Sequence, residues 1–238
     1  DSTALPEQVV ADVIHSAFQS AGQRCSALRV LYLQDDVADR VLQILDGAMA
    51  ELHVGDPRDL GTDVGPVIDE DARKNLQAHI DRLKGEGRLI SETPLKPEHT
   101  SEGTFVAPAA FTIDGIDALE REQFGPVLHV VRWKSSELDK VIASINARGY
   151  GLTFGVHSRN ESFADEIARK VRVGNVYINR NIIGAVVGVQ PFGGQGLSGT
   201  GPKAGGPNYL LRFATEKTVT NNTAALGGNA SLLALGDE

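Results

Sequence analysis

The most reactive side chain in this sequence belongs to Cys25, the single cysteine among 238 residues. It stands in GQRCS (22–26), beside Arg24 and just after a helical pattern that Gly22 ends. A loop position next to a cation favours the nucleophilic thiolate. Free cysteines also serve as small buried hydrophobic residues, and position alone leaves the two interpretations equal.

A second pattern with chemical meaning is GGQGLSG, which places Gly194, Gly196 and Gly199 in G-x-G-x-x-G spacing. A dinucleotide-binding loop of this kind needs a strand before it and a helix after it. Here VQPFG precedes it, and TGPKAGGP follows with two prolines and no helical run. We therefore interpret the stretch as a tight irregular loop in which backbone approaches backbone or ligand.

Helical and strand patterns alternate along the chain that must position these residues. Apolar residues after Pro6 recur at helical spacing, and short apolar runs at 27–33 and 126–133 are typical of buried strands. This alternation predicts an α/β protein with a mainly parallel open sheet and flanking helices. The expected helices cover 6–21, 37–52, 71–84, 137–147 and 162–171, and the expected strands cover 27–33, 88–91, 105–113, 126–133, 152–156 and 175–178.

The composition excludes several classes of protein. A hydrophobic content of 41% is enough for a core, and a net charge of −8 argues against a nucleic-acid partner. A single cysteine cannot form an internal disulfide, and no apolar run approaches the roughly 20 residues of a membrane span. No metal-ligand pattern is apparent. We expect a cytoplasmic protein.

Five stretches together resemble the aldehyde dehydrogenase superfamily, in that family's order and at about its separations. They are GQRCS (22–26), LHVGDP (52–57), EQFGPV (122–127), GNVYIN (174–179) and QPFGGQGLSGTG (190–201). The segments 180–194 and 198–213, which include NIIGAVVG and GPKAGGP, are similar to the glutamate-semialdehyde (pyrroline-5-carboxylate) dehydrogenase branch. The C-terminal part of the bacterial bifunctional proline-utilization enzymes is the nearest resemblance within that branch.

The resemblance implies NAD-dependent oxidation of L-glutamate γ-semialdehyde to L-glutamate in proline catabolism. Cys25 matches the nucleophile that forms a thioester, and its backbone N–H is an expected donor to the oxyanion. Glu122 is implied to bind the nicotinamide ribose and Phe124 to pack near the nicotinamide. Without the resemblance, Glu122 is an ordinary surface carboxylate and Phe124 an ordinary core aromatic residue.

The same branch implies a site for the substrate carboxylate. Ser26 offers a hydroxyl, and Gly184 and Ala185 offer backbone N–H groups that small side chains leave accessible. Phe192 is implied to form part of the apolar wall around the aldehyde chain. Arg180 has no residue-level support and stays unassigned.

The resemblance also divides the chain and points beyond it. Residues 1–213 correspond to the catalytic domain without its Rossmann-type cofactor half, and 214–238 to an oligomerisation strand and tail. The general base and the second oxyanion donor are expected upstream, so we expect the isolated chain to be inactive.

We expect a homo-oligomer through residues near 214–223. The resemblance implies FAD only in a proline dehydrogenase domain of the longer bacterial enzyme, and it implies peripheral association of that enzyme with the inner membrane. The choice between NAD and NADP is open.

Two other functions remain open. An acylating aldehyde dehydrogenase would pass the thioester to coenzyme A, against which the anchor loop argues. A non-catalytic assembly module would use the late strand and the tail, and would leave Cys25 no more reactive than a free cysteine. A cysteine hydrolase is set aside, because no histidine stands in a recognisable base motif.

Overall fold

The computed structural model describes residues 1–227 of the 238. The predicted helices and strands form close to their expected limits. The helices are α1 (Pro6–Phe18), α2 (Asp35–Ala50), α3 (Glu70–Gly85), α4 (Pro97–Thr100), α5 (Leu138–Ala147) and α6 (Glu161–Lys170), with short 3₁₀ segments at Gln19–Gly22, Ile116–Ala118, Ser135–Glu137, Leu210–Phe213 and Thr223–Leu226. The strands are β1 (Val30–Gln34), β2 (Leu89–Glu92), β3 (Ala109–Thr112), β4 (Val127–Trp133), β5 (Tyr150–Gly151), β6 (Thr153–Val156), β7 (Asn175–Ile178) and β8 (Gln195–Gly196).

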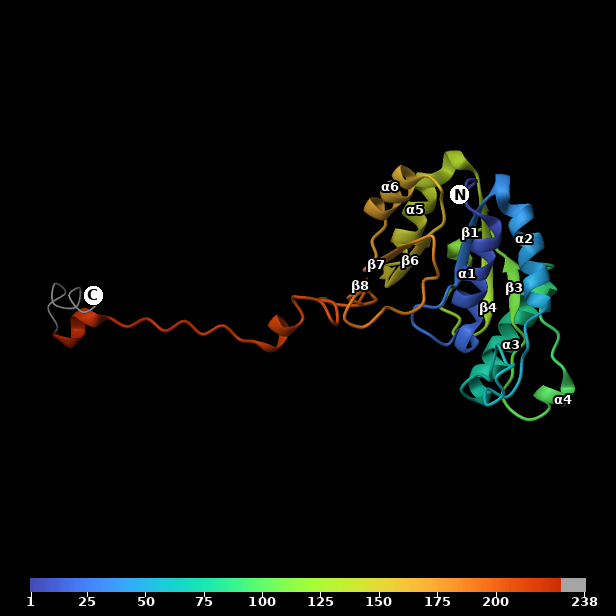
Figure 1. Ribbon diagram of the computed structural model, residues 1–238, viewed down its shortest axis with the longest axis horizontal. Coiled ribbons are helices and arrows are strands. Elements are labelled where there is room, and N and C mark those ends of the chain that lie inside the picture. The colour runs from blue at the N-terminus through green and yellow to red at the C-terminus, as the bar shows by residue number, and fades with distance from the viewer. Residues whose placement is uncertain (228–238) are drawn as a thin grey trace.

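A four-stranded sheet in the order β1-β4-β3-β2 forms the larger part of the fold. The β1–β4 and β3–β4 pairs are parallel, and β2 joins the edge antiparallel to β3. β4 lies between two parallel partners, which is why its sequence VLHVVRW is apolar almost throughout. Helices α1, α2 and α3 pack on this sheet and share its hydrophobic core (Figure 1).

A smaller unit holds β6 and β7, which pair in parallel, with α5 and α6 packed on them (Figure 1). The prediction of a mainly parallel sheet with flanking helices is confirmed, but the parallel strands fall into two separate sheets. In the described part of the chain, β1 and β6 each keep one edge without a strand partner.

A cavity of about 550 Å³ lies between the two units. Residues of α1, β1, α5 and β6 contribute to its lining, and Cys25 lies on its wall. The cavity therefore connects the candidate nucleophile with the space between the two sheets. None of the helices formed by residues 1–227 is long and apolar enough to cross a membrane.

The segment after Phe213 leaves the folded body. Residues 214–222 are exposed, belong to no helix or strand, and extend away from the two sheets as the orange-red end of the ribbon (Figure 1). The strand expected at 214–223 therefore pairs with no described strand of this chain. Residues 228–238 of the expected tail lie outside the described residues.

Candidate active site

Cys25 lies in a tight turn between the end of α1 and β1. The N–H of Ala27 donates to the carbonyl of Arg24 at 3.1 Å, so Cys25 and Ser26 are the two central residues of this turn. Cys25 is exposed, whereas Ser26 is buried. Within residues 1–227 the backbone N–H of Cys25 donates to no protein acceptor. The thiol and this N–H are thus both available to a ligand.

The chain reaches this turn through an unusual backbone conformation. Ser20, Ala21 and Gly22 follow one another with φ values of 55°, 53° and 64°, a left-handed region that costs about 1–2 kcal/mol for each residue with a side chain. A Cβ on Gly22 would overlap the carbonyl oxygen of Gly125. The backbone before Cys25 therefore lies directly against the 122–127 loop, and only glycine permits this approach.

Arg29, four residues after Cys25, connects these two loops. Its Nε donates to Oε1 of Glu122 at 2.9 Å. Its Nη1 donates to the carbonyl of Gly22 at 2.6 Å, and its Nη2 donates to that of Arg24 at 3.0 Å. The guanidinium carbon lies 4.3 Å from the centre of the Phe124 ring, a cation–π contact. Arg29 therefore holds the segment before Cys25 and both predicted cofactor residues.

The electrostatics of Arg29 reflect this position. Its side chain is only 14% exposed, and burial lowers its pKa. The hydrogen bond and negative charge of Glu122 oppose this effect, followed by the charge of the Cys25 thiolate. A largely buried guanidinium is thus paired with the Glu122 carboxylate beside the Cys25 turn.

Glu122 and Phe124 remain accessible despite their contacts with Arg29. The Glu122 side chain is 36% exposed and Phe124 is 44% exposed. Both line the cavity that also contains Cys25. The structure therefore brings three of the predicted site residues to one wall. In the described part of the chain, no three His, Cys, Asp or Glu side chains gather as a metal site would need.

Three of the expected substrate residues, Gly184, Ala185 and Phe192, lie on the loop after β7, whereas Ser26 lies in the Cys25 turn. Gly184 has a φ of 75°, and its carbonyl accepts the Tyr177 hydroxyl at 3.1 Å. The N–H of Ile182 donates to the Ser16 hydroxyl at 3.1 Å, which attaches this loop to α1. Ser16 also accepts the N–H of Leu28 through its carbonyl at 2.9 Å, so one buried serine connects the anchor loop to the segment after Cys25.

None of the four expected substrate residues lines the cavity. Ser26, Gly184, Ala185 and Phe192 are not among its lining residues, whereas the unassigned Arg180 is. Phe192 pairs through both backbone groups with Ala204 at 3.0 Å. The roles proposed for these four residues in substrate binding remain predictions.

The glycine-rich loop packs backbone against backbone. A Cβ on Gly194 would lie 2.6 Å from the carbonyl oxygen of Ser198, and one on Gly199 would lie 2.6 Å from that of Gly194. β8, which contains Gly196, is two residues long, and residues 197–209 form no helix. Lys203 donates to the carbonyl of Gly174, which supports a role in shaping this loop. The interpretation of a tight irregular loop matches this packing.

Sequence reasoning did not single out Arg29, although it stands only four residues after the cysteine in CSALR. It also missed the close approach of Gly22 to Gly125, which joins the GQRC and FGPV stretches. Two sequence features could have indicated this. The GQRC and FGPV motifs both contain a glycine, and an arginine stands between the reactive cysteine and a strand.

Comparisons with protein families and with known proteins identify relatives of this chain. The model of the family described as "Aldehyde dehydrogenase family" matches residues 2–219. The "Bifunctional protein PutA" of Klebsiella aerogenes is 54% identical over 221 residues, which cover 91% of this chain and 17% of that protein. The chain thus spans under a fifth of this curated relative.

Two solved structures are also similar. A mutant of Bradyrhizobium japonicum Proline Utilization A (PutA) is 58% identical with a TM-score of 0.88, over 95% of this chain and 23% of that one. A 1-pyrroline-5-carboxylate dehydrogenase from Thermus with bound NAD is 38% identical with a TM-score of 0.80, over 90% of this chain and 40% of that one.

Proposed function

Because the chain belongs to the aldehyde dehydrogenase family, we propose that it forms the catalytic segment of an enzyme that oxidises L-glutamate γ-semialdehyde to L-glutamate. The observation that carries this proposal is the exposed Cys25 turn, which Arg29 ties to Glu122 and Phe124 on one cavity wall. The similarity to PutA and to 1-pyrroline-5-carboxylate dehydrogenases supports the choice of substrate.

Cys25 is the proposed nucleophile. Its thiolate adds to the aldehyde carbon, and the carbonyl oxygen becomes an alkoxide that accepts the uncommitted N–H of Cys25. Loss of hydride from the same carbon leaves a thioester on Cys25. Water then attacks the thioester carbon, which releases the carboxylate and returns the thiol. Arg29 holds the turn during these steps through its hydrogen bond to the Arg24 carbonyl.

Glu122 and Phe124 suit the nicotinamide end of NAD. A carboxylate can accept hydroxyl groups of a ribose, and Arg29 engages Oε1 of Glu122 while the side chain remains about one-third exposed. The exposed Phe124 ring offers an apolar face beside the Cys25 wall. NAD, when bound there, accepts the hydride. Arg29 orients both residues before any ligand arrives.

The α-carboxylate of the semialdehyde would bind the anchor loop. We propose Ser26 and the N–H groups of Gly184 and Ala185 as its donors, with Phe192 beside the aldehyde chain. The attachment of this loop to α1 through Ser16 supports the proposal, because it ties the anchor to the segment that follows the nucleophile. The separation between this loop and the Cys25 thiol would then determine how long a substrate the site accepts.

The test is NADH formation from glutamate semialdehyde. Three proteins are compared: this chain, a longer protein in which the upstream part of the PutA relative precedes Asp1, and the longer protein with Cys25→Ala. We expect turnover only in the longer protein with Cys25 intact, because the glycine-rich loop of this chain is occupied by its own backbone packing. Turnover by the chain alone would contradict the proposed need for an upstream cofactor part. Turnover that requires coenzyme A would favour the acylating reaction instead.

We also propose that residues 214–223 join a sheet of a second copy. Residues 214–222 are extended and have no partner strand among residues 1–227 (Figure 1). Extended segments with free backbone groups readily add to sheets. Light scattering on the longer protein should show an oligomer, and removal of residues 214–238 should reduce its mass to that of one copy. An unchanged mass would exclude this segment as the interface.

A further inference from the structure

Two buried histidines face each other beneath the candidate site. His79 on α3 is 8% exposed, and His129 on β4 is fully buried between β1 and β3. Their Nε2 atoms lie 2.9 Å apart, and the rings meet edge to face. At this distance one of the two nitrogens must carry a proton and the other must accept it.

The partners of the remaining ring nitrogens fix which tautomer each histidine adopts. Nδ1 of His129 lies 2.9 Å from the carbonyl oxygen of Arg29, which only accepts, so His129 is protonated at Nδ1. Its Nε2 is then the acceptor, and His79 must donate from Nε2. Nδ1 of His79 is left as an acceptor, and it faces Nη2 of Arg82 at 3.4 Å, a group that only donates. One assignment satisfies all three contacts.

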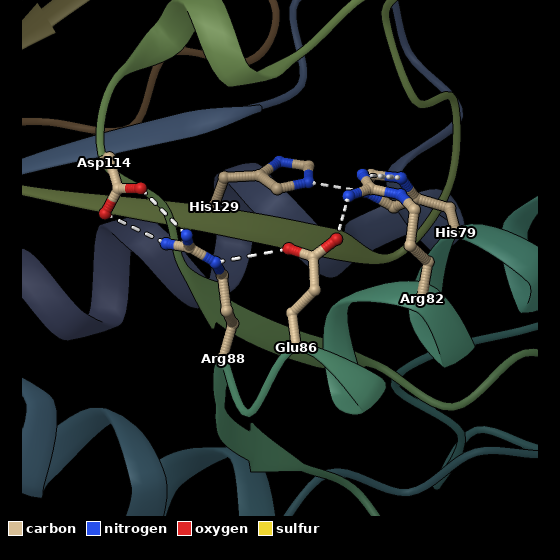
Figure 2. A network of polar contacts seen from close by, with 6 residues as sticks. All are labelled: His79, Arg82, Glu86, Arg88, Asp114 and His129. Carbon is tan, nitrogen blue, oxygen red and sulfur yellow. Dashed lines mark hydrogen bonds and ion pairs between the residues drawn. The ribbon is translucent and has the colours of Figure 1, made fainter.

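At the surface end of this series of hydrogen bonds, ion pairs hold the Arg82 guanidinium. Arg82 donates to Glu86 at 2.7 Å, and Glu86 lies 3.3 Å from Nε of Arg88 (Figure 2). Arg88 in turn donates through both Nη atoms to the carboxylate of Asp114 at 3.0 and 2.8 Å. These contacts orient the Arg82 guanidinium toward His79.

At its buried end, the same series of hydrogen bonds reaches the candidate site through His129. The Arg29 carbonyl accepts both the backbone N–H of His129 at 3.0 Å and its ring Nδ1–H. The Arg29 side chain holds the Cys25 turn and Glu122. Fixing the Arg29 peptide therefore limits how far its guanidinium can move.

We propose that His79 and His129, both neutral and in complementary tautomers, are positioning residues for the site, since they fix the Arg29 peptide and through it the Cys25 turn and the Glu122 loop. The effect on catalysis rests on the proposed function, whereas the tautomers and their effect on Cys25 do not. Neither histidine lines the cavity that contains Cys25.

The surroundings favour neutral rings. Burial is the largest cause that lowers the pKa of each histidine to about 4. The charged groups that act on the pair are Arg82, Glu86, Arg121 and Arg29. Three of these four are cations, so they add to the effect of burial. Both rings are neutral at pH 7, as the three contacts require.

The direct test is nitrogen-15 NMR of this chain with labelled histidine at pH 7. Long-range nitrogen–proton correlations distinguish a ring protonated at Nδ1, at Nε2 or at both. We expect His129 as the Nδ1–H tautomer and His79 as the Nε2–H tautomer. The opposite assignment, or a doubly protonated ring, would overturn the proposal whatever the enzyme does.

The functional test uses variants that separate the two ring nitrogens of His129. The amide of His129→Asn can still donate to the Arg29 carbonyl in place of Nδ1, whereas His129→Leu cannot. We expect His129→Leu to lower kcat of the longer protein about tenfold with little change in KM for the aldehyde. His129→Asn should recover most of this loss. In the chain alone, the rate at which iodoacetamide alkylates Cys25 should change most in His129→Leu and less in His129→Asn.

Leu128→Ala is the matched control, because Leu128 is equally buried and precedes His129 on β4. It should lower stability without changing kcat or the alkylation rate of the folded protein. If His129→Leu behaves like this control, the pair is only part of the core and the proposal fails. If His129→Leu does not fold, His79→Gln against His79→Leu gives the same comparison, with the glutamine retaining a donor toward His129. An alkylation response without any aldehyde oxidation would contradict the proposed function and still support the positioning role.

Discussion

Nε of Arg29 donates to Oε1 of Glu122 at 2.9 Å, although the two residues stand 93 positions apart in the chain. The same guanidinium accounts for two further carbonyls and the face of Phe124. A planar group with five donors in a fixed arrangement is suited to this, and a lysine ammonium is not. Arg29 is therefore the residue that turns two separate loops into one site.

Arg29→Lys should loosen this connection while keeping the charge. We expect a loss of about 1–3 kcal/mol in the free energy of unfolding, because the carbonyls of Gly22 and Arg24 lose their partner in a part-buried place. Urea unfolding measures this change. Arg132→Lys, which affects a more exposed guanidinium paired with Asp35 and Asp39, is the control and should cost under about 1 kcal/mol. Equal losses in both variants would contradict the special role of Arg29.

Gly22→Ala should be among the most destabilising small changes in the chain. The new Cβ would overlap the Gly125 carbonyl and would also stand at a φ of 64°. We expect a loss of about 3 kcal/mol or more in the free energy of unfolding, and faster exchange of the amide protons around Cys25.

Gly47→Ala is the control for that substitution, because Gly47 lies in α2 with no atom within 4 Å of the added Cβ. Alanine should stabilise this helix by up to about 1 kcal/mol. A mild effect of Gly22→Ala, comparable in size to that of Gly47→Ala, would show that the loops before Cys25 and after Glu122 can separate freely.

Most of the longer local elements were predictable, because apolar spacing sets their limits within a few residues, whereas the short α4, β5 and β8 were not predicted. The run PVLHVVRW predicts β4, and its buried neighbours explain why the apolar run is nearly continuous. The division into two sheets was not predictable. It depends on whether β1 and β6 meet, and they do not pair across the cavity that separates them. No local pattern records a long-range pairing.

Motif resemblance located part of the candidate site, and the roles of its residues stay predictions. Cys25, Glu122 and Phe124 came from motif resemblance, and the structure places them on one wall. Arg29 was missed because its partners are carbonyl groups and a distant carboxylate, which its place between the cysteine and a strand does not identify. His129 was missed for a related reason. It stands inside an apolar run, and its partner on α3 is 50 positions away.

Acid should destabilise the protein through the histidine pair. The pKa of each histidine is lowered from 6.5 to about 4 in the folded chain, so the unfolded chain binds more protons between these values. Stability is therefore fully present above pH 6.5, falls as pH decreases through this window, and levels off below pH 4. Protonation of one histidine of the pair lowers the free energy of unfolding by roughly 3 kcal/mol across this window.

Urea midpoints measured from pH 7 to pH 4 check this dependence. The double variant His79→Gln with His129→Asn carries no titrating ring at either position, so its curve should be flatter by the contribution of the pair. The two proteins share every other acidic and basic group. Parallel curves would mean that the histidines titrate alike in the folded and unfolded states.

The last prediction concerns the glycine-rich loop. Gly194→Ala would place a Cβ 2.6 Å from the carbonyl oxygen of Ser198 and 2.9 Å from that of Gly151. Backbone atoms cannot move aside as a flexible side chain can, so we expect a loss of about 2 kcal/mol or more in stability. The loop serves packing in our account, and the affinity of the longer protein for NAD should therefore remain within about twofold at temperatures where it stays folded, a change under about 0.5 kcal/mol. Gly85→Ala, where the added Cβ meets no atom within 4 Å, controls for substitution itself. A tenfold loss of NAD affinity in Gly194→Ala alone would place the cofactor phosphates on this loop and contradict the backbone-packing account.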